Sequence, residues 1–164
     1  MGENIRVRFA PSPTGKVHIG NIRAAIYNWL FARHTGGKFL LRVEDTDLER
    51  STPEAIKVLF ECMEWLGLDY DEEVFYQTKN VKRHLEVVDQ LLASGHAYKV
   101  EKTSRDGKTG VVTMFRMPKE GVIEYDDIVK GHMAKKAEDI QDFAIVRSDG
   151  SPIFHIANVV DDID

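Results

Sequence analysis

Apolar residues in the first part of the chain recur with spacings that predict a helix between two strands. Ile5–Ala10 alternates apolar and basic residues, as a strand with one buried face does. From His18 to Thr35 the apolar residues return at helical spacing, and Gly36-Gly37 predicts the end of that helix. Lys38–Val43 has the pattern of a second, largely buried strand. The apolar residues of the helical pattern are Ile19, Ile22, Ile26, Trp29 and Leu30.

Two further helices follow the second strand. Ser51–Glu54 combines a capping box with a proline in the first turn, which predicts a helix start. This helix is expected to reach Gly67, with Ile56, Leu59, Phe60, Met63 and Leu66 as its apolar residues. A third helix is expected over Lys79–Ser94, ended by Gly95. The order strand, helix, strand, helix, helix predicts an α/β layer with a parallel sheet.

The pattern changes after Gly95 to short β-like runs separated by turns rich in Gly and Asp. This change predicts a small β-rich insertion over residues 96–143, followed by a return strand to the main sheet within residues 144–164. The domain division is therefore 1–95, 96–143 and 144–164. Ile153–Val160 is expected to be an apolar strand that stops on acidic residues. The β-like runs are Ala97–Val100, Val111–Met117, Val122–Tyr125 and Phe143–Arg147.

Composition and charge restrict the classes of function. A net charge of −5 is unlike that of a protein that coats nucleic acid nonspecifically, although a local basic patch stays open. No run approaches the roughly 18 apolar residues that cross a bilayer. Cys62 is the single cysteine, so no intrachain disulfide and no site of several thiolates can form.

The segment Phe9–Asn21 carries the most informative chemistry. It joins a strand to a helix through a turn containing prolines and glycine, and a helix N-terminus favours an anion such as phosphate. Gly15 and Gly20 would let a ligand approach the backbone closely. His18 stands at the mouth of the helix and could donate a hydrogen bond to a phosphate oxygen. A helix-capping or buried role explains the same histidine equally simply.

Three motifs in order resemble the bacterial-type glutamyl-tRNA synthetases, which are class I aminoacyl-tRNA synthetases. Pro11-Ser12-Pro13-Thr14-Gly15-x-x-His18-Ile19-Gly20-Asn21 is similar to their HIGH region. Val43-Glu44-Asp45-Thr46-Asp47-x-x-Arg50 resembles their next motif. The stretch from Ser148 to Asp162 is similar to a third. Together the motifs span nearly the whole chain, which is expected to be the N-terminal part of such an enzyme.

The resemblance implies a fold and a reaction. The fold would be the first half of a Rossmann-like (HUP-type) parallel sheet carrying a small β-rich insertion. The reaction would be activation of L-glutamate by ATP with Mg²⁺ and transfer of glutamate to tRNA(Glu), which implies a cytoplasmic location. His18 would be the catalytic residue, stabilising charge on the α-phosphate. The ATP-binding residues would be Thr14, Gly15, His18, Gly20 and Asn21.

The resemblance also implies sites for the other two substrates. Arg8 would act as a fork for a carboxylate and Glu44 would accept from the substrate ammonium. The other residues expected in the glutamate pocket are Ala10, Ser12, Asn158 and Phe154. Asp47 and Arg50 would lie where the tRNA acceptor end enters, although an ion pair between residues three apart would explain them equally well. The insertion would bind the acceptor stem through its lysines and arginines.

The chain departs from the family pattern at several positions. The second ATP motif, a lysine-rich loop, is not found among the 164 residues, so this chain is expected to be inactive or very weak by itself. The zinc-ligand cysteines that many relatives place after the position of Tyr98 are missing, so no zinc is expected. The insertion looks shortened. Phe154 stands where the family commonly has tyrosine, which removes one hydroxyl from the pocket.

Other readings stay open. One is a glutamyl-queuosine-type synthetase that modifies tRNA, and another is a catalytically inert nucleotide- or RNA-binding fragment. A dinucleotide-binding oxidoreductase is excluded because no Gly-x-Gly-x-x-Gly follows the first strand. An incomplete sheet edge predicts self-association.

Overall fold

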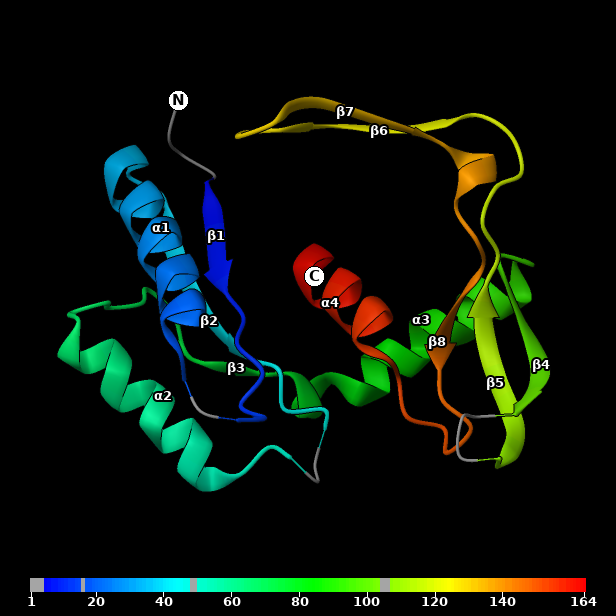
Figure 1. The fold of residues 1–164 in the computed structure, drawn as a ribbon, viewed down its shortest axis with the longest axis horizontal. Helices are drawn as coiled ribbons and strands as arrows, with labels where there is room; N and C mark the ends of the chain where they lie inside the picture. Colours follow the sequence, from blue (N-terminus) through cyan, green and yellow to red (C-terminus); the bar gives the residue numbers. More distant parts are fainter. Residues whose placement is uncertain (1–4, 16, 48–49, 104–106) are drawn as a thin grey trace. The chain divides into compact units, whose positions relative to one another are not determined.

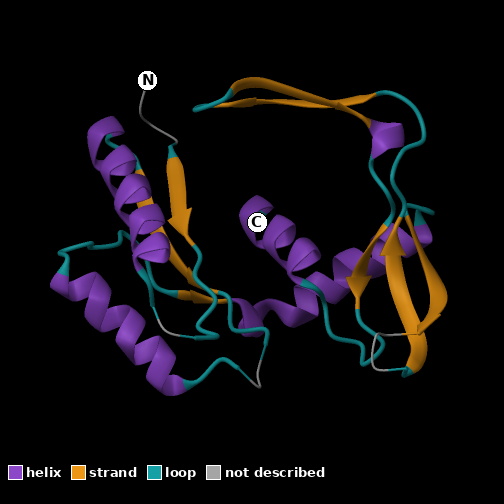
Figure 2. Ribbon diagram, in the orientation of Figure 1, coloured by secondary structure: helices purple, strands orange, loops and turns teal. Residues whose placement is uncertain are grey.

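A computed structural model of the chain describes residues 5–15, 17–47, 50–103 and 107–164 (Figure 1). The chain forms two compact units, called here unit 1 (Met1–Asn80) and unit 2 (Val81–Asp164). Figure 2 shows the contrast between them. Unit 1 combines helices with short strands, whereas most of the strand residues belong to unit 2.

Unit 1 is an α/β layer built on a parallel sheet. Its strands β1 (Arg6–Phe9), β2 (Lys38–Val43) and β3 (Phe75–Tyr76) lie in the order β1-β2-β3, and both pairings are parallel. Helix α1 (Ile19–Thr35) connects β1 to β2, and α2 (Pro53–Trp65) lies between β2 and β3. The 3₁₀ helix η1 (Gln77–Asn80) ends the unit. The predicted parallel α/β arrangement is confirmed, and β3 is an additional short strand.

The helices of unit 1 begin and end close to the sequence signals, but α2 is capped by Thr52 and not by Ser51, the first residue of the predicted capping box. His18 caps the start of α1, and Gly36 ends it in the left-handed region with φ 69°, where a glycine carries no penalty. At the start of α2 the hydroxyl of Thr52 accepts a hydrogen bond from the Ala55 N–H at 3.1 Å. Pro53 follows the cap directly, in the first turn, where its missing N–H costs nothing.

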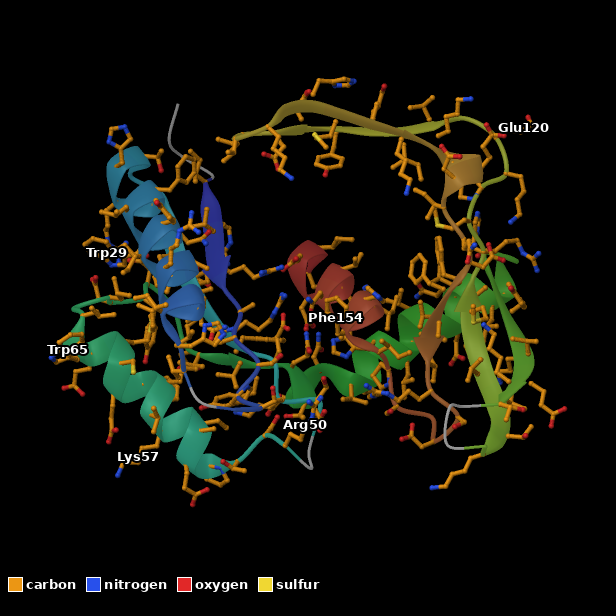
Figure 3. All side chains as sticks on the ribbon, viewed as in Figure 1. Trp29, Arg50, Lys57, Trp65, Glu120 and Phe154 are labelled. Carbon is orange, nitrogen blue, oxygen red and sulfur yellow. The ribbon has the colours of Figure 1, made fainter. Side chains whose placement is uncertain are left out.

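The core of unit 1 lies between β2 and the helices. Phe39, Leu41 and Val43 of β2 are fully or almost fully buried, and they pack with Leu59 and Met63 of α2. Ile56, Phe60 and Leu66 pack against this cluster, so the predicted apolar face of α2 is confirmed. At the far end of α2, Trp65 is 85% exposed (Figure 3).

Helix α1 buries two alanines together with only part of its large apolar residues. Ala25 and Ala32 are completely buried, whereas Ile19 is 82% exposed and Leu30 is 50% exposed. Ile22 is also buried, and Ile26 and Trp29 are partly buried. Small alanines allow α1 to lie close to β1 and β2, while Ile19 and Leu30 stay exposed.

Unit 2 begins with a helix and continues with two described sets of strands. Helix α3 (Val81–Ala93) precedes an antiparallel sheet of β4 (Ala97–Thr103), β5 (Thr109–Phe115) and β8 (Phe143–Val146). Strands β6 (Val122–Asp127) and β7 (Gly131–Lys136) form a separate hairpin. All four predicted β-like runs are strands. Strand β7 was not predicted because its charged residues hide the alternation.

The end of unit 2 differs from the prediction. Residues Phe154–Ile163 form helix α4, so the expected strand over Ile153–Val160 is wrong. Ile156, Ala157 and Val160 are buried and spaced as one face of a helix, while Val159 is 55% exposed. Within residues 144–164, strand β8 pairs with β5. The expected return of this segment to the main sheet stays a prediction. The three-part domain division itself stays a prediction.

Two polar contacts hold α4 against α3. His84 Nε2 lies 2.7 Å from the Asp161 carboxylate, and both side chains are completely buried. Beside them, Arg83 donates to both carboxylate oxygens of Asp164, at 2.8 and 3.1 Å. This pairing lowers the pKa of Asp164. The orientation of α4 is therefore fixed by charge-assisted bonds as well as by apolar packing.

The buried alanines of α1 give a testable prediction. Ala25→Leu forces a large side chain into a completely buried position and should lower the free energy of unfolding by about 1–3 kcal/mol. Leu30→Ala removes a half-exposed side chain and should change the free energy of unfolding by no more than about 0.5 kcal/mol. Urea unfolding followed by tryptophan fluorescence reports on unit 1, because both Trp29 and Trp65 belong to it. Equal losses in the two variants would contradict the assigned face.

Candidate functional site

A pocket of about 600 Å³ opens in unit 1 beside the N-terminus of α1. Its walls come from the end of β1, the connection into α1, the first turns of α1, and two residues of α2, Ala55 and Leu59. Asn28, which the sequence analysis did not single out, also lines it. The predicted site residues that line the pocket are Arg8, Ala10, Ser12, Thr14, Gly15, His18, Gly20 and Asn21.

The pocket lies at the carboxyl edge of the parallel sheet. Strands β1 and β2 run in parallel with Phe9 opposite Leu41, so the residues after both strands emerge at the same edge. Ligands of open α/β sheets characteristically bind at this edge. Pro11 and Pro13 are buried and restrict the backbone of the connection, while Ser12 between them is exposed. The two prolines therefore fix the position of the Ser12 side chain at the pocket.

His18 is exposed and caps α1. Its Nδ1 accepts a hydrogen bond from the Gly20 N–H at 3.1 Å, and the Asn21 side chain accepts from the His18 N–H at 3.4 Å. A nitrogen that accepts from an N–H group carries no proton, so in the neutral ring the proton resides on Nε2. His18 therefore has the capping role that was one of its predicted alternatives. The same geometry leaves its Nε2–H as the donor for a ligand.

The first-turn N–H groups near His18 already donate within the cap. The Gly20 N–H donates to His18 Nδ1, and the Asn21 N–H donates to the His18 carbonyl at 3.0 Å. A phosphate held by either N–H would have to displace one of these bonds. A Cβ at Gly20 would lie 2.9 Å from His18 Cε1, so a side chain at position 20 would shift the ring that caps the helix. At Gly15 a Cβ would meet nothing within 4 Å.

Glu44 contacts the pocket wall without lining the pocket itself. Its backbone N–H donates to the Pro11 carbonyl at 3.0 Å, which links the connections after β1 and β2. One carboxylate oxygen accepts from Arg42 Nη2 at 3.2 Å, and the other accepts from the Ser12 hydroxyl at 3.5 Å. Arg42 was missed by the sequence reasoning. The available signal was a cation in the middle of the otherwise apolar end of β2.

The two aspartates after Glu44 have separate partners. Asp45 accepts from the Thr78 N–H at 2.9 Å and from the Thr78 hydroxyl at 2.7 Å, which ties the end of β2 to η1. Asp47 accepts from Arg50 Nε at 2.7 Å, and this contact raises the pKa of the exposed Arg50 (Figure 3). The simpler explanation for this pair, an ion pair three residues apart, is therefore confirmed. A role at the tRNA acceptor end stays a prediction.

Phe154 and Asn158 belong to unit 2, on α4. Phe154 is 49% exposed at the start of the helix, and its ring centroid lies 4.2 Å from that of His155 (Figure 3). Asn158 lies one turn later and is half-buried. The grouping of these two residues with Arg8 and Glu44 in one glutamate pocket stays a prediction.

Within residues 5–15, 17–47, 50–103 and 107–164, no group of three or more His, Cys, Asp or Glu residues could hold a metal ion. In the same ranges, no helix is both long enough and apolar enough to pass through a bilayer.

Comparison with known proteins identifies relatives of the whole chain. The family described as tRNA synthetases class I (E and Q), catalytic domain, matches residues 4–109 and 99–164. The glutamate–tRNA ligase of Francisella philomiragia subsp. philomiragia is 43% identical over 189 residues, covering 98% of this chain and 40% of the relative. That of Chromobacterium violaceum is 45% identical over 193 residues, covering 98% and 42%.

Solved structures agree with these relatives. The crystal structure of a glutamate tRNA ligase from Elizabethkingia meningosepticum, in complex with its amino acid, is similar with a TM-score of 0.87 at 29% identity. The structure of the glutamate-tRNA synthetase from Elizabethkingia anophelis gives 0.88 at 29% identity. Each match covers 98% of this chain and 42% of the solved chain. This chain spans about two fifths of the length of the relatives that it matches.

The family match includes the connection from β1 into α1, which contributes to the wall of the pocket. The chain belongs to the class I tRNA synthetases of the E and Q type, within their catalytic domain.

Proposed function

We propose that this chain supplies the ATP- and glutamate-binding part of a glutamate–tRNA ligase. The observation that carries the proposal is the pocket at the N-terminus of α1, where eight predicted substrate-binding residues line one cavity. The relatives are named as glutamate–tRNA ligases, and the match extends over almost the whole chain. The substrates would be ATP with Mg²⁺, L-glutamate and tRNA(Glu).

The proposed chemistry begins with activation of glutamate. A carboxylate oxygen of glutamate attacks the α-phosphorus of ATP, so a mixed anhydride forms and pyrophosphate leaves. His18 Nε2–H donates to an α-phosphate oxygen as negative charge develops there, and a donor already held by its helix cap needs no reorganisation. Mg²⁺ supplies charge neutralisation on the phosphates. A hydroxyl at the tRNA 3′ end then takes the glutamyl group and AMP leaves.

Recognition of glutamate would use charge at both ends of the molecule. Arg8 is half-buried at the pocket wall and can hold a carboxylate through two parallel N–H donors. Glu44 accepts from the ammonium, and Ser12 and Ala10 shape the wall between them. Phe154 and Asn158, which belong to unit 2, stay predicted glutamate-binding residues from the family resemblance alone. Without a tyrosine hydroxyl at position 154, the site lacks a hydrogen bond of about 1 kcal/mol.

The remaining architecture would be that of a Rossmann-like half-domain with a shortened insertion. The alignments to the relatives run over 189 and 193 residues, which is longer than this chain, so the relatives carry residues that it lacks. The two family matches overlap at residues 99–109, which favours the β4–β5 hairpin as the place of the shortening. We propose that the insertion binds the acceptor stem without zinc, and that Asp47 and Arg50 contact the acceptor end.

Two further parts of the proposal concern the location of the protein in the cell and its self-association. We propose that the enzyme acts in the cytoplasm, where its substrates are present. Strand β1 is an edge of the sheet order β1-β2-β3, which favours self-association of the chain through that edge.

His18 gives the most direct test. His18→Ala removes the Nε2–H donor and should weaken binding of Mg-ATP to the chain about tenfold or more in a calorimetric titration. His34→Ala is the matched control, because His34 is an exposed histidine in the last turn of the same helix. The control should bind ATP as the wild-type chain does. A wild-type chain that fails to bind Mg-ATP at millimolar concentration would overturn the proposed function.

Gly20→Ala tests whether the His18 ring that caps α1 is also the group that binds the ligand. The added Cβ would lie 2.9 Å from the imidazole and push it out of position, so ATP binding should weaken by about threefold to tenfold. In the His18→Ala background the same substitution should have little further effect, because no ring is left to displace. Full additivity of the two losses would show that Gly20 acts independently of His18.

Catalysis by the 164-residue chain is expected to be very poor. The lysine-rich second ATP motif is not part of its sequence, so phosphates would be stabilised from one side only. Glutamate-dependent exchange of pyrophosphate into ATP should therefore run far below the roughly 1–10³ s⁻¹ of ordinary enzymes. Exchange by this chain at the rate of an intact ligase would contradict the expectation.

A further inference from the structure

Arg42 is a buried cation that none of the assigned substrate roles uses. It lies in β2 between Leu41 and Val43, which are 2% and 0% exposed, and its own side chain is 5% exposed. Burial of a guanidinium is expensive, and an apolar residue of similar volume would stabilise the fold equally well or better. A buried arginine at this position therefore indicates a task other than stability.

The contact that Arg42 makes points to that task. Its Nη2 donates to Glu44 Oε1 at 3.2 Å, and the Glu44 side chain is only 11% exposed. The Ser12 hydroxyl donates to the other oxygen, and the Glu44 N–H donates to the Pro11 carbonyl. The carboxylate is thus anchored through each oxygen and through its own backbone. A carboxylate has about four acceptor positions, so anchored oxygens can still accept from a ligand.

We propose that Arg42 is a positioning residue that orients the Glu44 carboxylate to accept the ammonium group of the amino-acid substrate. The inference rests on the proposed function. Arg42 does not touch the ligand. It fixes one oxygen of Glu44 and restricts the rotation of the side chain, so the carboxylate meets the ammonium without losing further conformational freedom. Its effect is therefore confined to ligands that carry an ammonium group.

The test compares L-glutamate with glutarate, the same dicarboxylate without the amino group. Both are titrated calorimetrically into the 164-residue chain in the presence of ATP. The wild-type chain should prefer glutamate about tenfold or more. Arg42→Met should remove most of this preference by weakening glutamate binding, while glutarate and Mg-ATP bind as before. Arg42→Lys keeps a cation on a flexible stem and should restore part of the preference.

The matched control is Arg6→Met. Arg6 lies on the neighbouring strand β1, and its ion pair with Glu72 is exposed, with side chains 53% and 36% accessible. This variant should keep the preference for glutamate. A second check uses Glu44→Gln, in which adding Arg42→Met should change glutamate binding little, because the oriented carboxylate is already lost.

The outcomes separate the inference from the proposed function. If the wild-type chain prefers glutamate and Arg42→Met retains that preference, the positioning role is wrong and the proposed function stands. Equal weakening of glutamate and glutarate would assign Arg42 a structural role only and overturn the inference. If Arg42→Met does not fold, Arg42→Lys replaces it in the test. A partial loss of affinity for glutamate alone would support the positioning role, and an equal loss for glutamate and glutarate would overturn it. A wild-type chain that binds neither ATP nor glutamate overturns both proposals.

Discussion

The parallel pairing of β1 with β2 is the constraint on which the rest of unit 1 depends. The residues that follow two parallel strands lie at the same edge of the sheet. Ser12 after β1 and Glu44 after β2 are therefore neighbours, although 32 positions separate them. The same edge receives the N-terminus of α1, because a short connection leads there from β1. A polar wall, a carboxylate and a helix terminus therefore meet as a consequence of strand direction.

Charges at this edge are arranged so that each has a partner among residues of nearby elements. Arg42 and Glu44 form a buried pair, Asp47 pairs with Arg50, and Asp45 accepts from Thr78. The acidic run after β2 is therefore divided among three tasks. One carboxylate stays close to the pocket, one fixes the chain that follows β3, and one holds an exposed arginine. Such a division explains how a dense acidic segment avoids mutual repulsion at a site that would receive triphosphate.

The sequence predicted those parts of the structure in which local signals and tertiary packing agree. The strand Lys38–Val43, the end of α1 at Gly36 and the start of α2 within Ser51–Glu54 were predicted because each rests on a local pattern. The contact face of α1 was not, since it is decided by how closely alanines let the helix approach the sheet. Helix α4 was missed because a short apolar run has no clear period before its neighbours are known. Arg42 was missed because its partner becomes visible only in three dimensions.

The imidazole of His18 accepts in the helix cap through Nδ1 and offers a donor through Nε2–H, which restricts the residues that could replace it. A serine or asparagine can cap a helix, but neither places a second, opposite-facing donor nitrogen on a rigid ring. The capping bond also requires Nδ1 to be unprotonated. Any residue that replaced the histidine would therefore have to supply both the acceptor that closes the first turn of α1 and the donor beside the pocket.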